Sequence, residues 1–261
     1  MSVLREKLDG DGILLGTHIF IGDPSITECM AMVGYDVMWI DTEHTAIEKE
    51  RLINTLIAAR AGGTPSMVRI PWNDKVLAKP VLDMGSDAIL FPNVRTPDEA
   101  REAVRACEYP PDGERGYGPL RALGYGEIRQ SEYVTKRYRE TLRFIQIEDI
   151  MAVERLDEIC EVPGTDGFIV GPNDLSASMG HLDNTLHPEM LPVYDRIGEI
   201  TRRHGKVLGV SVGYDSAVVR AWKARGVKLI FCGSDISHIH DGAKRTLEKM
   251  KLDTGGKIWD T

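Results

Sequence analysis

Short apolar runs alternate with helical patterns along this chain, and this rhythm constrains its fold more than any other feature. The runs typical of buried strands lie at residues 13–21, 37–41, 66–70, 88–91, 143–147, 167–170, 207–212 and 228–232. Helical patterns separate them, and no shift in composition divides the chain, which is typical of one domain with a parallel sheet. For 261 residues, we predict an α/β fold in which residues 1–261 form a single (β/α)8 TIM barrel rather than an open doubly wound sheet.

The region 109–133 breaks this rhythm. It contains Pro110-Pro111, several glycines and arginines, and little periodicity. We take seven of these eight runs as clear strands, and we expect the remaining strand of the barrel to be short, lying near Arg115 or hidden elsewhere in this glycine-rich region. A loop of this length inside a compact domain is usually functional or mobile.

Two of the predicted strands end abruptly in a carboxylate. Phe144–Ile147 is followed by Glu148, and Gly167–Val170 is followed within a few residues by Asp174. A carboxylate at the end of a buried strand is costly unless water, hydrogen bonds or a cation receive it. Successive strands of one sheet would bring both acids to a common point, which indicates a divalent-metal site. The alternative is that each acid caps the helix that follows it, and position alone leaves both interpretations open.

The same rim of a barrel would carry two further reactive side chains. Active sites of (β/α)8 barrels lie at the carboxyl ends of the strands. The second predicted strand ends in Asp41-Thr-Glu-His44 and the third in Arg69. Arg69 offers a planar fork for a carboxylate or a developing enolate oxygen, and His44 has the pKa range to move protons near neutrality. The alternatives are an arginine paired with a neighbouring acid and a histidine that only lines a loop.

These residue types favour metal-assisted carbonyl chemistry. Glu148 and Asp174 are hard oxygen ligands that would leave positions for water and a bidentate substrate, which suits Mg²⁺, Mn²⁺ or Co²⁺ better than structural zinc. An imine-forming aldolase is disfavoured, because Lys206 and Lys228 begin strands and the other lysines fall on helix or loop patterns. Four further histidines are expected to be structural: His187, His204, His238 and His240.

Composition excludes several other classes of function. The net charge of −8 argues against a general nucleic-acid binder. No apolar run approaches the roughly 20 residues of a membrane span, and no G-x-G-x-x-G or P-loop motif is present. The first seven residues lack the apolar core of a signal peptide, and the four cysteines form no CxxC pair, so we expect a cytoplasmic location. Residues from Leu252 onward are expected to form a loose end.

Five motifs together resemble the HpcH/HpaI aldolase family of metal-dependent (class II) pyruvate aldolases, which includes 4-hydroxy-2-oxoheptanedioate aldolase and 2-keto-3-deoxyglucarate aldolase. They occur in the same order and cover the chain from about Gly16 to the last helix. Any one would be weak, but the set is specific. The motifs are Asp41–His44, Val68–Asp74, Tyr109–Gly116, Gln146–Glu148 and Phe168–Gly180.

The resemblance implies a (β/α)8 barrel with a defined set of roles. Glu148 and Asp174 would be the metal ligands, Arg69 would contact the pyruvyl oxygens, and His44 would be the acid/base residue. Gln146 would lie near the metal. The backbone around Gly171, Pro172, Asn173 and Asp174 would cradle the substrate carboxylate.

The resemblance also implies a homo-oligomer, with hexamers expected. Relatives pair the histidine with an aspartate at the position of Asp83. By sequence, Asp83 lies near the end of a helix that runs away from the rim of the third strand, so it would not reach His44 of its own barrel. A neighbouring subunit would therefore have to supply it.

The reaction implied is reversible cleavage of a 4-hydroxy-2-oxo acid to pyruvate and an aldehyde. Decarboxylation of oxaloacetate, or a macrophomate synthase-like condensation, would use the same pyruvate enolate. A barrel that binds a metal and a 2-oxo acid without turnover is the alternative of another class. Thr42 and Asn173 stand where relatives more often carry a smaller residue, and residues 117–125 diverge from the better-known aldolases. The resemblance therefore does not identify the aldehyde that this chain would use.

Overall fold

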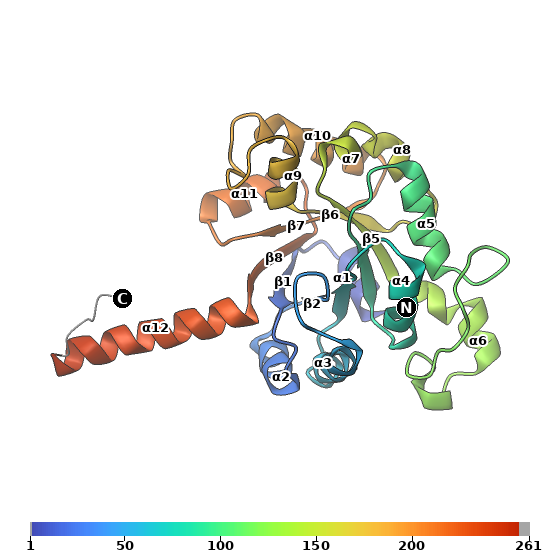
Figure 1. The fold of residues 1–261 in the computed structure, drawn as a ribbon, viewed down its shortest axis with the longest axis horizontal. Coiled ribbons are helices and arrows are strands. Elements are labelled where there is room, and N and C mark those ends of the chain that lie inside the picture. Colours follow the sequence, from blue (N-terminus) through green and yellow to red (C-terminus); the bar gives the residue numbers. More distant parts are fainter. Residues whose placement is uncertain (1, 256–261) are drawn as a thin grey trace.

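Eight parallel strands close into a barrel in the computed structural model, which describes residues 2–255 (Figure 1). Each strand pairs with the next in sequence, and β8 pairs with β1. The prediction of a (β/α)8 barrel is confirmed. The strands are β1 (Leu14–Ile19), β2 (Val37–Asp41), β3 (Ser66–Arg69), β4 (Ala88–Phe91), β5 (Leu142–Ile147), β6 (Gly167–Val170), β7 (Val207–Val212) and β8 (Leu229–Ser234).

The expected position of the eighth strand is wrong. Each of the apolar runs in the sequence forms a strand, so they already supply all eight, and no strand lies near Arg115 or elsewhere in residues 109–133. That segment packs outside the barrel instead. Tyr109, Tyr133 and Tyr138 form a separate cluster, and the Arg115 guanidinium lies 4.8 Å from the ring centroid of Tyr109. Contacts among aromatic side chains therefore hold this segment in place, and such contacts leave no regular spacing of apolar residues in the sequence.

Helices follow the strands and form the outer layer, and capping residues start several of them. Asp23 accepts hydrogen bonds from two backbone N–H groups at the start of α2, and Thr96 forms a capping box with Glu99 at the start of α5. The helices are α1 (Val3–Asp9), α2 (Pro24–Val33), α3 (Lys49–Ala61), α4 (Lys75–Asp83), α5 (Pro97–Cys107), η1 (Gly124–Gly126), α6 (Gln130–Thr135), η2 (Arg137–Glu140), α7 (Ile150–Glu154), α8 (Leu156–Cys160), α9 (Pro172–Ser178), α10 (Met190–Arg203), α11 (Ser216–Ala224) and α12 (Asp235–Thr254).

The core has two layers because successive residues of a strand face opposite sides. One cluster fills the barrel and includes Leu14, Trp39 and Phe231. The other packs the barrel against the helices and includes Ile40 and Val68, the neighbours of inward-facing residues. The interior is tight: a Cβ at Gly16 would stand 2.4 Å from the Phe231 ring, so this position has room only for glycine. The same alternation decides which side chains reach the carboxyl rim.

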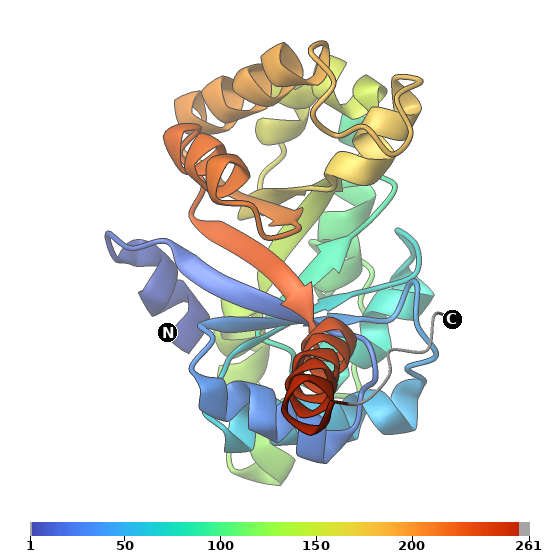
Figure 2. The same ribbon diagram turned by 90° about the vertical axis from the view of Figure 1, so that its left-hand side faces the viewer.

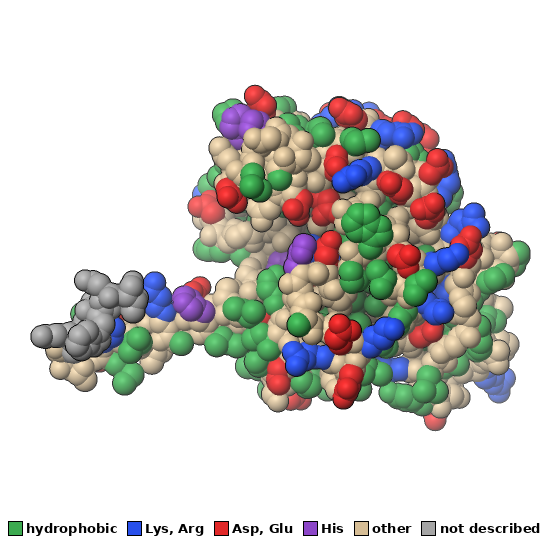
Figure 3. Space-filling view, in the orientation of Figure 1, with side chains coloured by type: hydrophobic (Ala, Val, Ile, Leu, Met, Phe, Trp, Pro, Cys, Tyr) green, Lys and Arg blue, Asp and Glu red, His purple; other side chains and the backbone are tan. Residues whose placement is uncertain are grey.

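The last helix does not lie along the barrel. α12 contacts β1, β8 and α2, but most of it extends away from the other elements (Figure 1), and Figure 2 looks nearly along its axis. Hydrophobic side chains are exposed along it, among them Ile239, Leu247 and Met250 (Figure 3). The helix runs to Thr254, so the expected loose end does not begin at Leu252, and residues 256–261 lie outside the described residues.

None of the helices within residues 2–255 has the length and apolar character needed to cross a membrane.

Candidate active site

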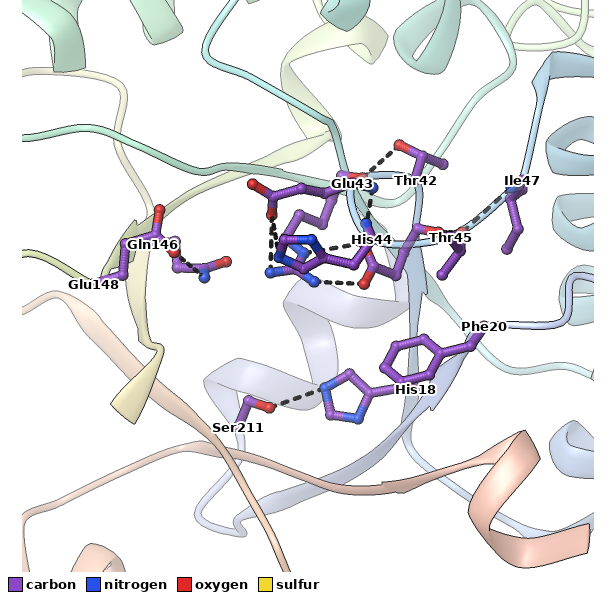
Figure 4. Close-up of polar contacts among 12 residues, drawn as sticks. His18, Phe20, Thr42, Glu43, His44, Thr45, Ile47, Gln146, Glu148 and Ser211 are labelled. Atoms are coloured by element: carbon purple, nitrogen blue, oxygen red, sulfur yellow. Dashed lines mark hydrogen bonds and ion pairs between the residues drawn. The ribbon is translucent and has the colours of Figure 1, made fainter. Parts of the chain in front are cut away.

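Polar side chains from several strands meet at the carboxyl end of the barrel (Figure 4). Asp41 and Arg69 are the last residues of β2 and β3, and Gln146 lies near the end of β5 with Glu148 just beyond it. This is the rim at which catalytic residues of (β/α)8 barrels lie. The predicted rim residues of β2, β3 and β5 are thus brought to one place by the closure of the sheet.

Arg69 is held rigidly by two acids. Its Nε and Nη2 donate to the two carboxylate oxygens of Asp41, at 3.1 and 2.5 Å, and its Nη1 lies 2.9 Å from Glu43 Oε2. Asp41 is fully buried, and the guanidinium also lies 5.1 Å from the Trp39 ring centroid. An arginine has five N–H donors, so at least two remain free of hydrogen bonds to residues 2–255. Pairing with a neighbouring acid, one alternative from the sequence, is therefore present, and it leaves the arginine able to bind a ligand.

Glu148 is positioned from two sides. Its Oε1 accepts a 2.6 Å hydrogen bond from the backbone N–H of Asn93, and its Oε2 accepts one from Gln146 Nε2. Asn93 follows β4 and has a positive φ of 58°, a conformation that asparagine tolerates better than most residues. The Gln146 side chain is buried, and its Oε1 has no hydrogen-bond partner among the described residues. An unpaired buried oxygen beside a carboxylate is an orphan acceptor that a cation or its water would satisfy.

The carboxylates at this rim crowd one another. Burial raises the pKa of Glu148 to about 7, and the charges of Glu43 and Asp174 add to the effect. Burial likewise raises the pKa of Glu43, opposed by Arg69 and reinforced by Asp41 and Asp174. Acids that raise one another's pKa in a buried site would gain from a divalent cation, and carboxylate oxygens are the ligands that Mg²⁺ and Mn²⁺ prefer. The donor set therefore fits a hard metal ion.

The segment after β6 supplies the remaining predicted contacts. Gly171 is the N-cap of α9, Pro172 and Asn173 begin that helix, and Asp174 lies in its first turn, exposed to solvent. A Cβ at Gly171 would stand 3.0 Å from Gln146 Nε2, so a side chain there would press on the amide beside Glu148. Pro172 has no N–H, so the first N–H groups of α9 without a carbonyl partner in the helix are those of Asn173 and Asp174. Asp174 itself belongs to the acidic cluster.

His44 lies on the loop that follows β2 and is largely solvent-exposed, with Nε2 3.8 Å from Glu43 Oε2. Asp83 ends α4, at the far end of that helix from the rim. It forms a 2.9 Å ion pair with Arg115, and its side chain is 21% exposed. No hydrogen bond or ion pair joins Asp83 to His44 among the described residues.

Sequence reasoning overlooked His18 and Ser211. His18 lies on β1 and is 8% exposed, and its Nε2 lies 3.0 Å from Ser211 Oγ on β7 (Figure 4). The signal was present in the alternation of the strand: Leu14 faces the barrel interior, so Gly16 and His18 face the same way. Glu43 was noted only as part of its motif, and Asn93 carried no signal because its contact is made through the backbone.

A second histidine cluster lies on the loop between α9 and α10. The ligand atoms of His181, His187 and Glu189 lie within 4.8 Å of one another, and His181 Nε2 is 2.9 Å from Glu189 Oε2. The two imidazole rings are stacked, 3.6 Å apart and 16° from parallel. The backbone N–H of Glu189 also donates to His187 Nδ1, 3.3 Å away, so hydrogen bonds within the loop already involve both histidines.

Comparison with known proteins identifies one family. The sequence model described as HpcH/HpaI aldolase/citrate lyase matches residues 16–241. The hydroxypyruvate/pyruvate aldolase of Roseovarius nubinhibens is 32% identical over 97% of this chain and 98% of its own length. A solved HpcH/HpaI aldolase/citrate lyase family protein from Burkholderia cenocepacia J2315 is also 32% identical, with a TM-score of 0.88 over 95% of this chain and 98% of its own. Macrophomate synthase is 25% identical, with a TM-score of 0.81 over 97% of this chain and 90% of its own.

Proposed function

This chain belongs to the HpcH/HpaI aldolase/citrate lyase family, and on that premise we propose that it cleaves 4-hydroxy-2-oxo acids reversibly to pyruvate and an aldehyde with the help of a divalent metal ion. It is an enzyme of the aldolase type, a carbon–carbon lyase. The observation that carries the proposal is the pairing of a rigidly held arginine with crowded carboxylates at the carboxyl rim. That pairing suits a reaction in which negative charge develops on a chelated 2-oxo acid.

We assign the metal to Glu148 and Asp174, with Mg²⁺, Mn²⁺ and Co²⁺ as candidates. When bound, the ion supplies Lewis-acid stabilisation of negative charge on the 2-oxo oxygen. Gln146 supports the site by orienting Glu148 through its amide. The substrate carboxylate would lie against the backbone of Gly171, Pro172 and Asn173, where the N–H groups of Asn173 and Asp174 can donate to it.

Arg69 adds a fixed positive charge at the enolate oxygen. Asp41 and Glu43 hold the guanidinium in place before the substrate arrives, so little reorganisation is needed as charge develops. During cleavage the C3–C4 bond breaks, its electron pair forms the enolate, and the aldehyde departs. His44 would take the proton of the C4 hydroxyl in that step and return it during condensation.

Exchange of the methyl protons of pyruvate tests this proposal without knowledge of the aldehyde. With Mn²⁺ or Co²⁺ in deuterated water, we expect the methyl signal of pyruvate to decline in proton NMR spectra, because the enolate forms and is reprotonated at carbon. Chelation should stop the exchange, and adding back the ion should restore it. Full activity after exhaustive chelation would contradict the metal assignment, and no exchange with either Mn²⁺ or Co²⁺ would favour a barrel that binds 2-oxo acids without turnover.

The likeness to macrophomate synthase favours one further candidate on the same residues. Decarboxylation of oxaloacetate, or a condensation of the macrophomate synthase kind, would form the same enolate with loss of carbon dioxide in place of an aldehyde. Comparing kcat/KM for oxaloacetate with that for a panel of 4-hydroxy-2-oxo acids separates these from aldol cleavage.

We further propose that the working form is a homo-oligomer, with a hexamer expected, in which Asp83 of a neighbour pairs with His44. The position of Asp83 at the far end of α4, beside Arg115, supports a role outside its own barrel. A cytoplasmic location stays a prediction.

Mixing two inactive variants tests the shared site. His44→Ala and Asp83→Asn are each expected to lose most activity, whereas co-expressed mixtures should recover part of it, because some interfaces then combine an intact His44 with an intact Asp83. Activity is measured beside native mass spectra that count hybrid oligomers, with each variant alone as the control. Hybrids that form without any recovered activity would sink the shared-site assignment.

A further inference from the structure

His18 and Ser211 form a hydrogen-bonded pair near the carboxyl end of the barrel. Figure 4 shows His18 and Ser211 together on β1 and β7, apart from the group formed by Glu43, Gln146 and Glu148. His18 makes no ion pair within the described part of the chain. The proposed function gives His18 and Ser211 no role, because it assigns the metal, the enolate oxygen and the acid/base step to other residues.

The hydrogen bonds fix which ring nitrogen of His18 carries the proton. Its Nδ1 lies 2.8 Å from the carbonyl oxygen of Gly233, and a carbonyl oxygen can only accept. Nδ1 therefore carries hydrogen, and in the neutral ring Nε2 presents a lone pair. The hydroxyl of Ser211, 3.0 Å away, donates to it. Burial lowers the pKa of His18 below its ordinary value of 6.5, although the hydrogen bond to Gly233 opposes this effect. The lowered pKa keeps the ring neutral at physiological pH.

The ring is also held in place by its neighbours. Its centroid lies 5.0 Å from that of Trp39, 5.4 Å from Phe20 and 5.9 Å from Phe231. A histidine packed on three rings and anchored to a backbone oxygen cannot easily turn its lone pair away. Nε2 is therefore a fixed acceptor, and Ser211 is a hydroxyl that can rotate beside it.

We propose that the pair formed by His18 and Ser211 recognises a hydroxyl group on the aldehyde half of the substrate, so that the enzyme prefers hydroxylated aldehydes to unsubstituted aldehydes and to those with a second carboxylate. This inference rests on the proposed function, since only an aldolase has an aldehyde half to select.

The chemistry of the pair accounts for both preferences. A substrate hydroxyl can donate to Nε2 and accept from Ser211, which replaces the bond between the two side chains with two new ones. An unsubstituted aldehyde offers nothing in exchange, and a site built to bond a hydroxyl rejects a ligand that lacks it. A carboxylate would place negative charge against the lone pair, and protonation of the ring to meet it is opposed by burial.

Three aldehydes of similar size test the inference in the condensation direction with pyruvate. On the aldehyde carbon, glycolaldehyde carries a hydroxymethyl group, acetaldehyde a methyl group and glyoxylate a carboxylate. For the wild-type protein we expect kcat/KM for glycolaldehyde to exceed that for each of the others by ~10-fold or more. In His18→Phe, which keeps an aromatic ring but has no lone pair, and in Ser211→Ala, that ratio should fall toward one.

The nearby His238 provides a matched control. It lies on α12, where its Nε2 is 3.2 Å from Thr17 Oγ1 and from Tyr35 Oη. His238→Gln should keep the wild-type ratio, whereas a merely structural role for His18 would lower the rate with all three aldehydes together and leave their ratio unchanged.

Proton exchange of pyruvate without any aldehyde tests the proposed function separately from the role of His18 and Ser211. Normal exchange in the wild type, with equal kcat/KM for the three aldehydes, overturns this inference alone. Normal exchange with a wild-type ratio retained in both His18→Phe and Ser211→Ala also overturns it. Absence of exchange overturns the proposed function and this inference with it.

Discussion

Replacing Arg69 with alanine is expected to lower kcat/KM for aldol cleavage by roughly 10²–10³-fold or more, the loss typical of removing one charge-stabilising donor from an active site. The guanidinium is almost fully enclosed by Asp41, Glu43 and Trp39. Water that entered the space would not restore a fixed positive charge at the enolate oxygen. Steady-state kinetics on a 4-hydroxy-2-oxo acid, or pyruvate proton exchange, measures the loss.

The same substitution also breaks a buried ion pair, so stability has to be separated from catalysis. Asp41 would be left buried without its partner, which typically costs about 3–5 kcal/mol. Arg69→Lys keeps the charge but cannot form the two-pronged bond, and it should remain folded in thermal melts while turnover stays low. Arg95, an arginine paired with Asp149 outside the predicted site, is the control, and Arg95→Ala should be nearly neutral. Wild-type turnover in Arg69→Lys would contradict the role assigned to the planar fork.

Glu148→Gln is expected to remove both metal binding and turnover. The amide has almost the same shape and can still accept from the Asn93 N–H, but it is a neutral and weaker ligand. We expect metal affinity to fall on the order of 100-fold or more, since even outer-shell changes often cost 10–100-fold. Isothermal titration with Mn²⁺ measures the affinity, and the chelation assay measures the activity that depends on it.

The neighbouring residue in sequence provides the control for that loss. Asp149 is the N-cap of α7 and pairs with Arg95, so Asp149→Asn should lower the stability of the protein slightly without lowering its affinity for the metal ion. The pKa of Glu148, raised to about 7 without a cation, also predicts a pH dependence. Below pH 7 the metal ion must displace a proton from Glu148, so the affinity for the metal should fall as the pH is lowered. Unchanged Mn²⁺ affinity in Glu148→Gln would remove Glu148 from the ligand set.

The barrel could be predicted because strand and helix signals follow from local spacing. A buried parallel strand is a short apolar run whatever it packs against, so the runs at 37–41 and 167–170 coincide with β2 and with β6. The structure of segment 109–133 could not be predicted in this way. It is held by contacts among tyrosines and Arg115, which are far apart in the sequence and follow no regular spacing. The direction of α12 was equally hidden, because a helical pattern says nothing about where the helix packs.

The site was predictable where side chains stand at strand ends and unpredictable where the contact is distant or made by the backbone. Arg69 and Glu148 belong to strand-end motifs, and the sequence placed them on one rim. The partners that tune them, Glu43 and the N–H of Asn93, depend on how neighbouring loops turn back over the barrel. His18 could have been recognised by counting every second residue along β1 from Leu14.

The indole of Trp39 connects these observations. It is 2% exposed, and its ring centroid lies 5.1 Å from the Arg69 guanidinium carbon and 5.0 Å from the His18 ring centroid. Residues that share a packing partner are energetically coupled, so changes at them do not simply add. The residues proposed to bind the enolate half and the aldehyde half of the substrate therefore share one aromatic support, so under these proposals we expect a variant selected for a new aldehyde also to disturb Arg69.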